Sequence, residues 1–153
     1  MGLKSKYQTL RKINIKQFLQ ENIMGSEDSN QTLALSIGLG TFMAFAPVWG
    51  FQMAIAVSLA ILFRLNKVVV LLAANLSSIP PLVPLILYSS FQAGALLLQG
   101  SFLNEIPELD GLESLGNNLL LYLLGAILSG ALFGLIGLIF SYASLFLLRK
   151  KGR

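Results

Sequence analysis

The chain contains no cysteine and no histidine among its 153 residues. Disulfides, thiolate nucleophiles, imidazole bases and the usual ligands of zinc and haem are therefore excluded. Charge is scarce as well, because charged residues make up 12% of the chain whereas a soluble domain carries about 25%. We expect no catalytic residue, no cofactor and no metal, and a protein that is not an enzyme.

Apolar residues take the place of the missing charge. The chain is 55% hydrophobic and its mean hydropathy is +0.73. Three apolar stretches, Leu33 to Phe63, Val68 to Leu98 and Leu119 to Leu148, each contain about 30 residues, and a helix crosses a bilayer with about 20. The composition predicts a small, all-α, polytopic integral membrane protein with a single membrane domain over residues 29–153.

The basic residues lie in three clusters, within residues 4–16, 64–67 and 149–153. The connection 99–118 carries acidic residues and no Lys or Arg. Because basic residues stay on the cytoplasmic side of a membrane, we expect both termini in the cytoplasm and a periplasmic loop at 99–118, with the protein in the bacterial inner (cytoplasmic) membrane. The clusters lack interleaved aromatics, so we expect no nucleic-acid partner.

With this orientation, residues 33–64 begin and end on the cytoplasmic side and form a helical hairpin. Its arms, Leu33 to Ala46 and Phe51 to Phe63, contain 14 and 13 residues, or about 20 Å each, against a hydrocarbon core of about 30 Å. We favour a re-entrant hairpin over two short full spans. Irregular backbone at that depth must be shielded by protein or by water.

The second stretch, residues 68–98, is interrupted by prolines that cannot donate backbone N–H groups, and Asn75, Ser77 and Ser78 come just before them. We predict one transmembrane helix broken into two halves. The predicted helix-break residues of both stretches are Pro47, Trp49, Gly50, Pro80, Pro81 and Pro84.

The third stretch, residues 119–148, has no proline and no charge, which predicts one long transmembrane helix. Small residues on this helix allow another helix to approach closely, either within the chain or in a homo-oligomer. The candidate oligomer-interface residues are Ala126, Gly130, Gly134 and Gly137.

The first 28 residues place Ile15, Phe18, Leu19 and Ile23 at helical spacing, which predicts a cytoplasmic amphipathic helix on the inner leaflet. The basic residues of this segment serve either to attract anionic lipid or only to set the topology.

A known family shares this order of motifs. The run Ala34 to Gly38, then Pro47 to Gly50, then Arg64 to Asn66, then Asn75 followed by Pro80 and Pro81, resembles the bacterial membrane family called domain of unknown function 2062, over about residues 25 to 98. The chain has Leu76 where the family usually has Pro. Family members stand alone or are joined to glycosyltransferase-like domains, so the resemblance implies a role near lipid-linked sugars or envelope lipids and carries no established activity.

The broken segments support two hypotheses from different classes. The first is a small transporter or flippase-like protein for a membrane lipid or a lipid-linked amphiphile, such as an isoprenoid phosphate or a phospholipid, working as a homo-oligomer. The second is a non-transporting scaffold that recruits a glycosyltransferase or an acyltransferase in envelope biogenesis. The candidate substrate-binding residues are Gln52, Arg64, Asn66, Asn75, Ser77 and Ser78. For the polar ones the alternative is hydrogen bonding between helices, and for Arg64 it is anchoring at the membrane surface.

Overall fold

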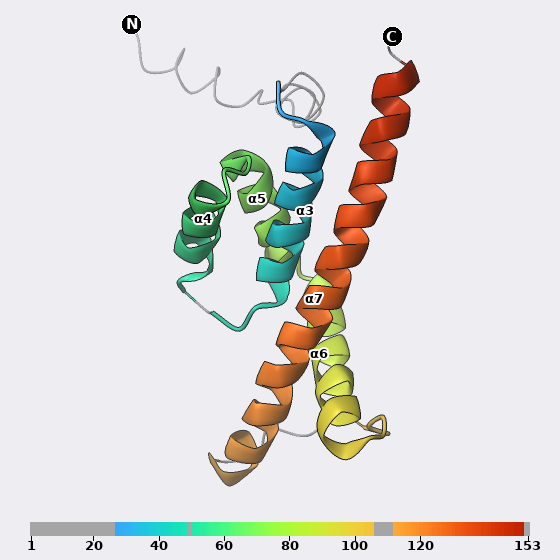
Figure 1. Cartoon of the computed structure of the whole chain (residues 1–153). Helices are drawn as coiled ribbons and strands as arrows, with labels where there is room; N and C mark the ends of the chain where they lie inside the picture. The colour runs from blue at the N-terminus through green and yellow to red at the C-terminus, as the bar shows by residue number, and fades with distance from the viewer. Residues whose placement is uncertain (1–26, 49, 106–111, 152–153) are drawn as a thin grey trace, which may run out of the picture.

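The computed structural model describes residues 27–48, 50–105 and 112–151, and for residues 112–117 and 151 it describes the backbone alone. Residues 1–26, which contain nearly all of the expected amphipathic N-terminal helix, are outside the described residues, and so is Trp49. Within the described ranges every regular element is a helix. In chain order these are α3 (Asn30–Phe45), α4 (Gln52–Leu62), α5 (Lys67–Ala74), the 3₁₀ helix η2 (Asn75–Ser78), α6 (Leu82–Gln99) and α7 (Leu112–Lys151) (Figure 1).

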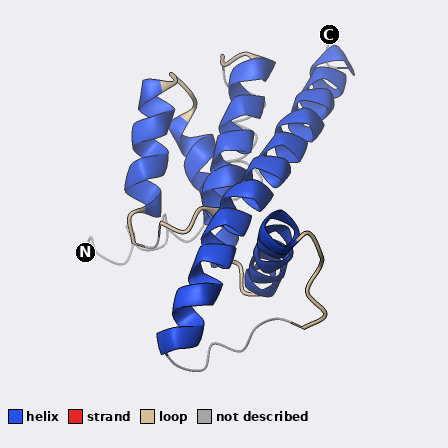
Figure 2. Ribbon diagram, turned by 60° about the horizontal axis from the view of Figure 1, so that its bottom comes forward, coloured by secondary structure: helices blue, strands red, loops and turns tan. Residues whose placement is uncertain are grey.

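Helix α7 runs the length of the molecule, and the other helices pack along it (Figures 1 and 2). Helix α3 lies antiparallel to the C-terminal half of α7, while α6 packs against its N-terminal half. Helix α5 covers another side of α3, and α4 packs against α5 at the edge. Helix α3 is therefore the central element of the upper half in Figure 1.

The helix ends follow the local sequence. The Ser29 hydroxyl accepts a hydrogen bond from the Thr32 backbone N–H at 3.1 Å and caps α3. Helix α3 ends at Phe45, two residues before Pro47, because a proline disfavours the helical conformation of the residue that precedes it. Helix α6 ends at Gln99 and is capped by Gly100, which adopts the left-handed conformation with a φ of 69°.

The second apolar stretch is interrupted as its sequence predicts, with η2 and a turn between α5 and α6. Pro81 is the N-cap of α6. Pro84 lies inside the first turn of α6, where a helix does not need the backbone N–H that proline lacks. The interruption therefore depends on Pro80 and Pro81, and the prediction that Pro84 breaks the helix is wrong.

The third stretch forms one helix, α7, which begins at Leu112. The loop predicted at 99–118 is therefore too long at its C-terminal end, because polar residues such as Asn117 and Asn118 continue a helix beyond its apolar part. Helices α6, over Leu82–Gln99, and α7, over Asn118–Lys150, are long and apolar enough to cross a membrane. By length and composition, they favour membrane association.

Helices α6 and α7 touch backbone to backbone. A Cβ atom added to Gly94 would lie 1.9 Å from the Leu121 carbonyl oxygen, and one added to Gly125 would lie 1.8 Å from the Ser90 carbonyl oxygen. The α3–α5 contact is similar, because a Cβ atom on Gly40 would lie 2.5 Å from the Val70 carbonyl oxygen. Glycine at these positions sets how closely the helices approach.

The small-residue stripe of α7 is covered within the chain. Gly130 packs against Phe42 and Phe45, and Gly134 packs against the Gly38 backbone. Ala126 is fully buried in a cluster with residues of α6, and the nearest neighbour of Gly137 is Thr41. The assignment of Ala126, Gly130, Gly134 and Gly137 to an interface between copies is therefore corrected, because α3 and α6 already occupy this face of α7.

Replacing Gly94 by Ala should destabilise the protein by about 1–3 kcal/mol, because the new methyl group forces α6 and α7 apart. Gly137→Ala is the matched control: its Cβ atom would lie 3.4 Å from the Thr41 hydroxyl oxygen, an ordinary contact distance. Equilibrium unfolding in detergent micelles, followed by circular dichroism, measures both. Equal stability of the two variants would contradict the close α6–α7 contact.

Candidate functional site

The two interruptions meet in space through Gln52, the first residue of α4. Its side-chain Nε2 donates to the Ala74 carbonyl oxygen at 2.8 Å and to the Ser77 hydroxyl at 3.1 Å. Ala74 is the last residue of α5, and carbonyl groups in the last turn of an α-helix have no intrahelical α-type partner. The side-chain amide of Gln52 therefore bonds a backbone carbonyl group that the helix break leaves without an intrahelical partner.

Two more candidates lie at this break. Asn75 Nδ2 donates to the Leu71 carbonyl oxygen at 3.0 Å and lies 3.8 Å from the Met53 sulfur. The Ser78 hydroxyl donates to Asn75 Oδ1 at 3.4 Å. Together with Gln52 and Ser77 these residues form one cluster, which we call the break cluster. Its hydrogen bonds lie within the chain, so each member has the helix-to-helix or local role that the sequence left as an alternative.

A cavity of about 210 Å³ lies beside the break cluster. Its walls come from the C-terminal end of α3, from α6 and from α7, and most of them are apolar. The lining residues with polar side chains are Gln52, Ser77 and Tyr122, whereas Asn75 and Ser78 do not line the cavity. The full lining is Ala44, Phe45, Ala46, Gln52, Ser77, Val83, Ile86, Leu87 and Tyr122. Apolar walls with a few neutral hydrogen-bonding groups suit part of an amphiphile.

The remaining candidates, Arg64 and Asn66, lie at the opposite end of α4. Asn66 caps α5, because its Oδ1 accepts from the backbone N–H groups of Val68 and Val69 at 3.1 Å each. Its Nδ2 donates to Asp28 Oδ2 at 2.6 Å, and its backbone N–H donates to the Ser36 hydroxyl at 3.0 Å. Asn66 thus has a structural role, which its position before an apolar run indicates in the sequence.

Asp28 extends this network to the far end of the chain. Its carbonyl oxygen accepts from Arg149 Nη1 at 2.9 Å. The start of α3, the α4–α5 turn and the end of α7 are therefore joined at one end of the molecule. Sequence reasoning missed Asp28 as the partner of both Asn66 and Arg149, because contacts between residues so far apart in the chain leave no local pattern.

Arg64 adopts an unusual backbone conformation, with a φ of 54°. It stands just after α4, where its N–H donates to the Ile61 carbonyl oxygen and the Leu65 N–H donates to the Ala60 carbonyl oxygen, at 3.1 and 2.7 Å. This pair of bonds is the Schellman motif, which usually has glycine at this position. The left-handed conformation costs a residue other than glycine roughly 1–2 kcal/mol.

The described residues form a small helical protein with two helices long and apolar enough to cross a membrane and with two interrupted apolar segments. The chain belongs to the bacterial family described as "Uncharacterized protein conserved in bacteria (DUF2062)", whose model matches residues 15–153. The resemblance found over residues 25 to 98 is thereby confirmed and extends through α7. Comparisons with curated proteins and with solved structures gave no match.

Replacing Arg64 by Gly should raise the free energy of unfolding by about 0.5–1 kcal/mol. The strain of the left-handed arginine is removed, and the greater freedom of glycine in the unfolded chain offsets roughly 0.5–1 kcal/mol of that gain. Lys150→Gly is the control, because Lys150 is an exposed cation in the ordinary helix α7 and should gain no stability. Equilibrium unfolding in micelles measures both, and a loss of stability in Arg64→Gly would show that its side chain supports the fold.

Proposed function

We propose that this protein is a small bacterial membrane protein that transports or flips a lipid or a lipid-linked amphiphile of the isoprenoid phosphate or phospholipid class. The observation that carries the proposal is the cavity at the two helix breaks, whose walls are apolar and whose polar groups are neutral. Interrupted helices that meet beside a cavity are the usual form of substrate sites in small-molecule transporters. An amphiphile has both kinds of surface that this cavity offers.

The arrangement of charge supports an inner-membrane location with the basic ends in the cytoplasm. Hydrogen bonds join Asp28 to Asn66 and to Arg149, so the α4–α5 turn and the end of α7 lie together (Figure 1). These are the places where two of the three basic clusters occur. The C-terminal end of α6 and the start of α7 lie at the other end of the molecule (Figure 1). Basic residues gathered at one end favour that end for the cytoplasm.

The contacts of the hairpin support a re-entrant path. Gly130, which packs against Phe42 and Phe45 at the end of α3, lies 18 residues from Leu148 in the 30-residue stretch 119–148. Counted from Leu148, at the cytoplasmic end, the turn between α3 and α4 therefore falls about three fifths of the way along the apolar part of α7. A hairpin that starts at the cytoplasmic end and turns at this depth does not need to cross the whole membrane.

Transport in this proposal uses no buried carboxylate or amine. No Asp, Glu, Lys or Arg lines the cavity, so movement depends on hydrogen bonds from neutral groups and on the gradient of the substrate. Because the described helices are few, a protein-lined pathway requires more than one copy of the chain. The interface then lies on a face other than the covered stripe of α7.

A second candidate function is favoured by the hydrogen bonds of the break cluster. Gln52 satisfies the Ala74 carbonyl group within the chain, which is what a packed structural break requires. In that case the protein is a membrane scaffold that recruits a glycosyltransferase or an acyltransferase of envelope biogenesis. A transport assay separates the two functions.

Cysteine labelling tests the topology without any background, since the chain has no cysteine. Single cysteines at Arg64 and at Arg153 should react with a membrane-impermeant maleimide only from the cytoplasmic side, and one at Glu108 only from the periplasmic side. Labelling of positions 64 and 108 from the same side would contradict the proposed path.

Filling the cavity tests the transport function. In liposomes, the wild-type protein should accelerate the flipping of fluorescent phosphatidylglycerol or of a labelled isoprenoid phosphate, and Val83→Trp should slow it severalfold by occupying the cavity. Leu85→Trp is the matched control, because Leu85 is exposed in the same turn of α6 and does not line the cavity. Dithionite quenching follows the rate.

A matched pair of serine variants tests the polar side of the cavity. Ser77→Ala removes a hydroxyl that lines the cavity, whereas Ser58→Ala removes one that bonds the Ala54 carbonyl group on exposed α4. Slower flipping in Ser77→Ala, with no change in Ser58→Ala, supports the proposal. Absence of flipping by the wild-type protein for both lipid classes would favour the scaffold.

A further inference from the structure

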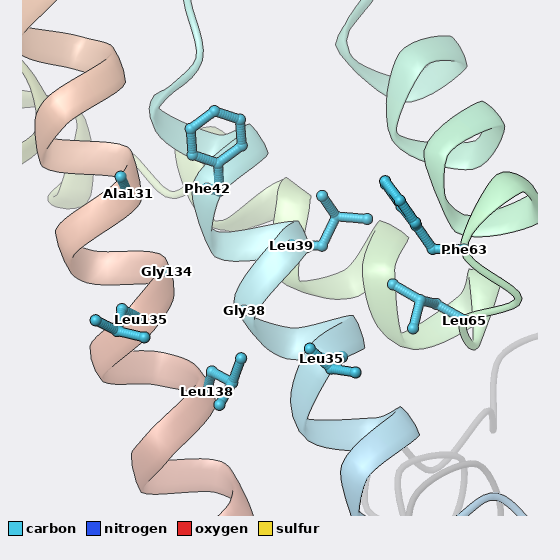
Figure 3. Close-up of a pocket in the computed structure, with 10 residues that line it drawn as sticks. All are labelled: Leu35, Gly38, Leu39, Phe42, Phe63, Leu65, Ala131, Gly134, Leu135 and Leu138. Carbon is cyan, nitrogen blue, oxygen red and sulfur yellow. The ribbon is translucent and has the colours of Figure 1, made fainter.

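A second, larger hollow lies away from the helix breaks. This apolar groove has a volume of about 490 Å³ and runs along α3, with α7 on one side and the α4–α5 turn on the other (Figure 3). Its lining contains no polar side chain: Leu35, Gly38, Leu39, Phe42, Phe63, Leu65, Ala131, Gly134, Leu135 and Leu138. The volume is within the range of about 300–1,000 Å³ that small-molecule sites occupy.

A cation, Arg64, belongs to the α4–α5 turn that forms one side of the groove. Arg64 stands between Phe63 and Leu65, which both line the groove. Its side chain is exposed, and no hydrogen bond or ion pair is found for its guanidinium group among the described residues. Lys67, exposed at the start of α5, adds a second positive charge nearby.

The backbone conformation at Arg64 is one that glycine adopts more easily than arginine. Its position after α4 is one where glycine is the favoured residue, and arginine holds the left-handed conformation there against its own preference. Strained residues of this kind concentrate at binding sites, where the side chain serves a ligand. The backbone strain at Arg64, the lack of a partner for its guanidinium group among the described residues, and the adjacent groove together point to an anionic ligand.

We propose that the groove binds one hydrocarbon tail of an anionic phospholipid whose phosphate pairs with Arg64. The groove walls continue into the apolar surface of the protein, since Leu35, Phe63 and Leu135 are all about half exposed or more. A lipid tail reaches such a groove from the surrounding bilayer. Guanidinium groups bind phosphate through charge-assisted, paired hydrogen bonds.

This lipid site does not depend on the proposed transport. It requires only that the protein lies in a membrane, and it is separate from the break cavity, because the two linings share no residue. Binding and flipping are measured by different experiments. Failure of flipping would therefore leave the lipid site standing, and failure of binding would leave the transport proposal standing.

Native mass spectrometry of the purified full chain, titrated with phosphatidylglycerol or phosphatidylcholine, tests the proposal. The wild-type protein should bind phosphatidylglycerol at least about fivefold more tightly, and Arg64→Gly should lose about fivefold of that affinity with little change for phosphatidylcholine. Arg64→Lys keeps the positive charge but loses the paired hydrogen bonds, so its preference should lie between those of the wild type and Arg64→Gly. Lys150→Gln, which removes a cation outside the groove, should retain all of it.

A second pair of variants tests the tail. Ala131 lines the groove from an exposed position on α7, so Ala131→Phe fills the groove without disturbing packed helices and should weaken binding of both lipids severalfold. Leu132→Phe, at the exposed neighbour outside the groove, should not. The two effects together separate recognition of the headgroup from recognition of the tail.

Three results would overturn the proposal. One is an unchanged ratio of the two lipid affinities in Arg64→Gly. Another is a dimer that Ala131→Phe converts to monomer, which would assign the groove to a second copy of the chain. The third is a disulfide between cysteines placed at Phe18 and Ala131, which would assign it to the N-terminal segment.

Discussion

Hydrocarbon offers backbone groups no hydrogen-bond partner, and each unpaired N–H or C=O group there costs several kcal/mol. For a chain proposed to lie in a membrane, two interrupted apolar segments are therefore a serious constraint. The chain meets it by bringing both interruptions together, where the Gln52 amide bonds the Ala74 carbonyl group and the Ser77 hydroxyl. The cavity lies beside this meeting point and is lined by Gln52 and Ser77.

The same constraint explains the use of glycine. Lipid tails are as apolar as leucine, so helices in a membrane associate through close packing rather than through the hydrophobic effect. Gly94 and Gly125 let α6 and α7 touch, while Gly40 lets α3 approach α5. The Gly40 contact holds α3 close to α5, and the Gly38–Gly134 contact holds α3 close to α7. Gly134 has two contacts of interest, because it touches the α3 backbone and also lines the apolar groove.

The sequence predicted the fold better than the site. Proline positions and apolar stretches located the hairpin, the interruption and the long helix, since these depend on local chemistry. The division of the six candidate residues into two groups depends on contacts between distant segments, such as Gln52 with Ala74 and Asn66 with Asp28. The sequence also does not show whether a serine hydroxyl bonds its own helix or lines a site. Ser36 bonds the Thr32 carbonyl group of its own helix, whereas Ser77 lines a cavity, and only the tertiary structure distinguishes the two.

The groove and the cavity follow each other along α3. Phe42 lines the groove, and Ala44 and Phe45, within the next turn, line the cavity. A lipid whose phosphate binds Arg64 would extend its tail along α3 toward the break cluster. The cavity, at about 210 Å³, is smaller than typical small-molecule sites, so a headgroup enters only if α6 moves away from the hairpin. In the proposed transport, this movement would occur at the interruption between η2 and α6, where few hydrogen bonds join the two elements, among them those from Ile79 to Leu76 and from Leu82 to Ile79. The break in the second apolar stretch would then have two roles: its neutral groups would bind the ligand, and it would be the hinge that makes room for that ligand.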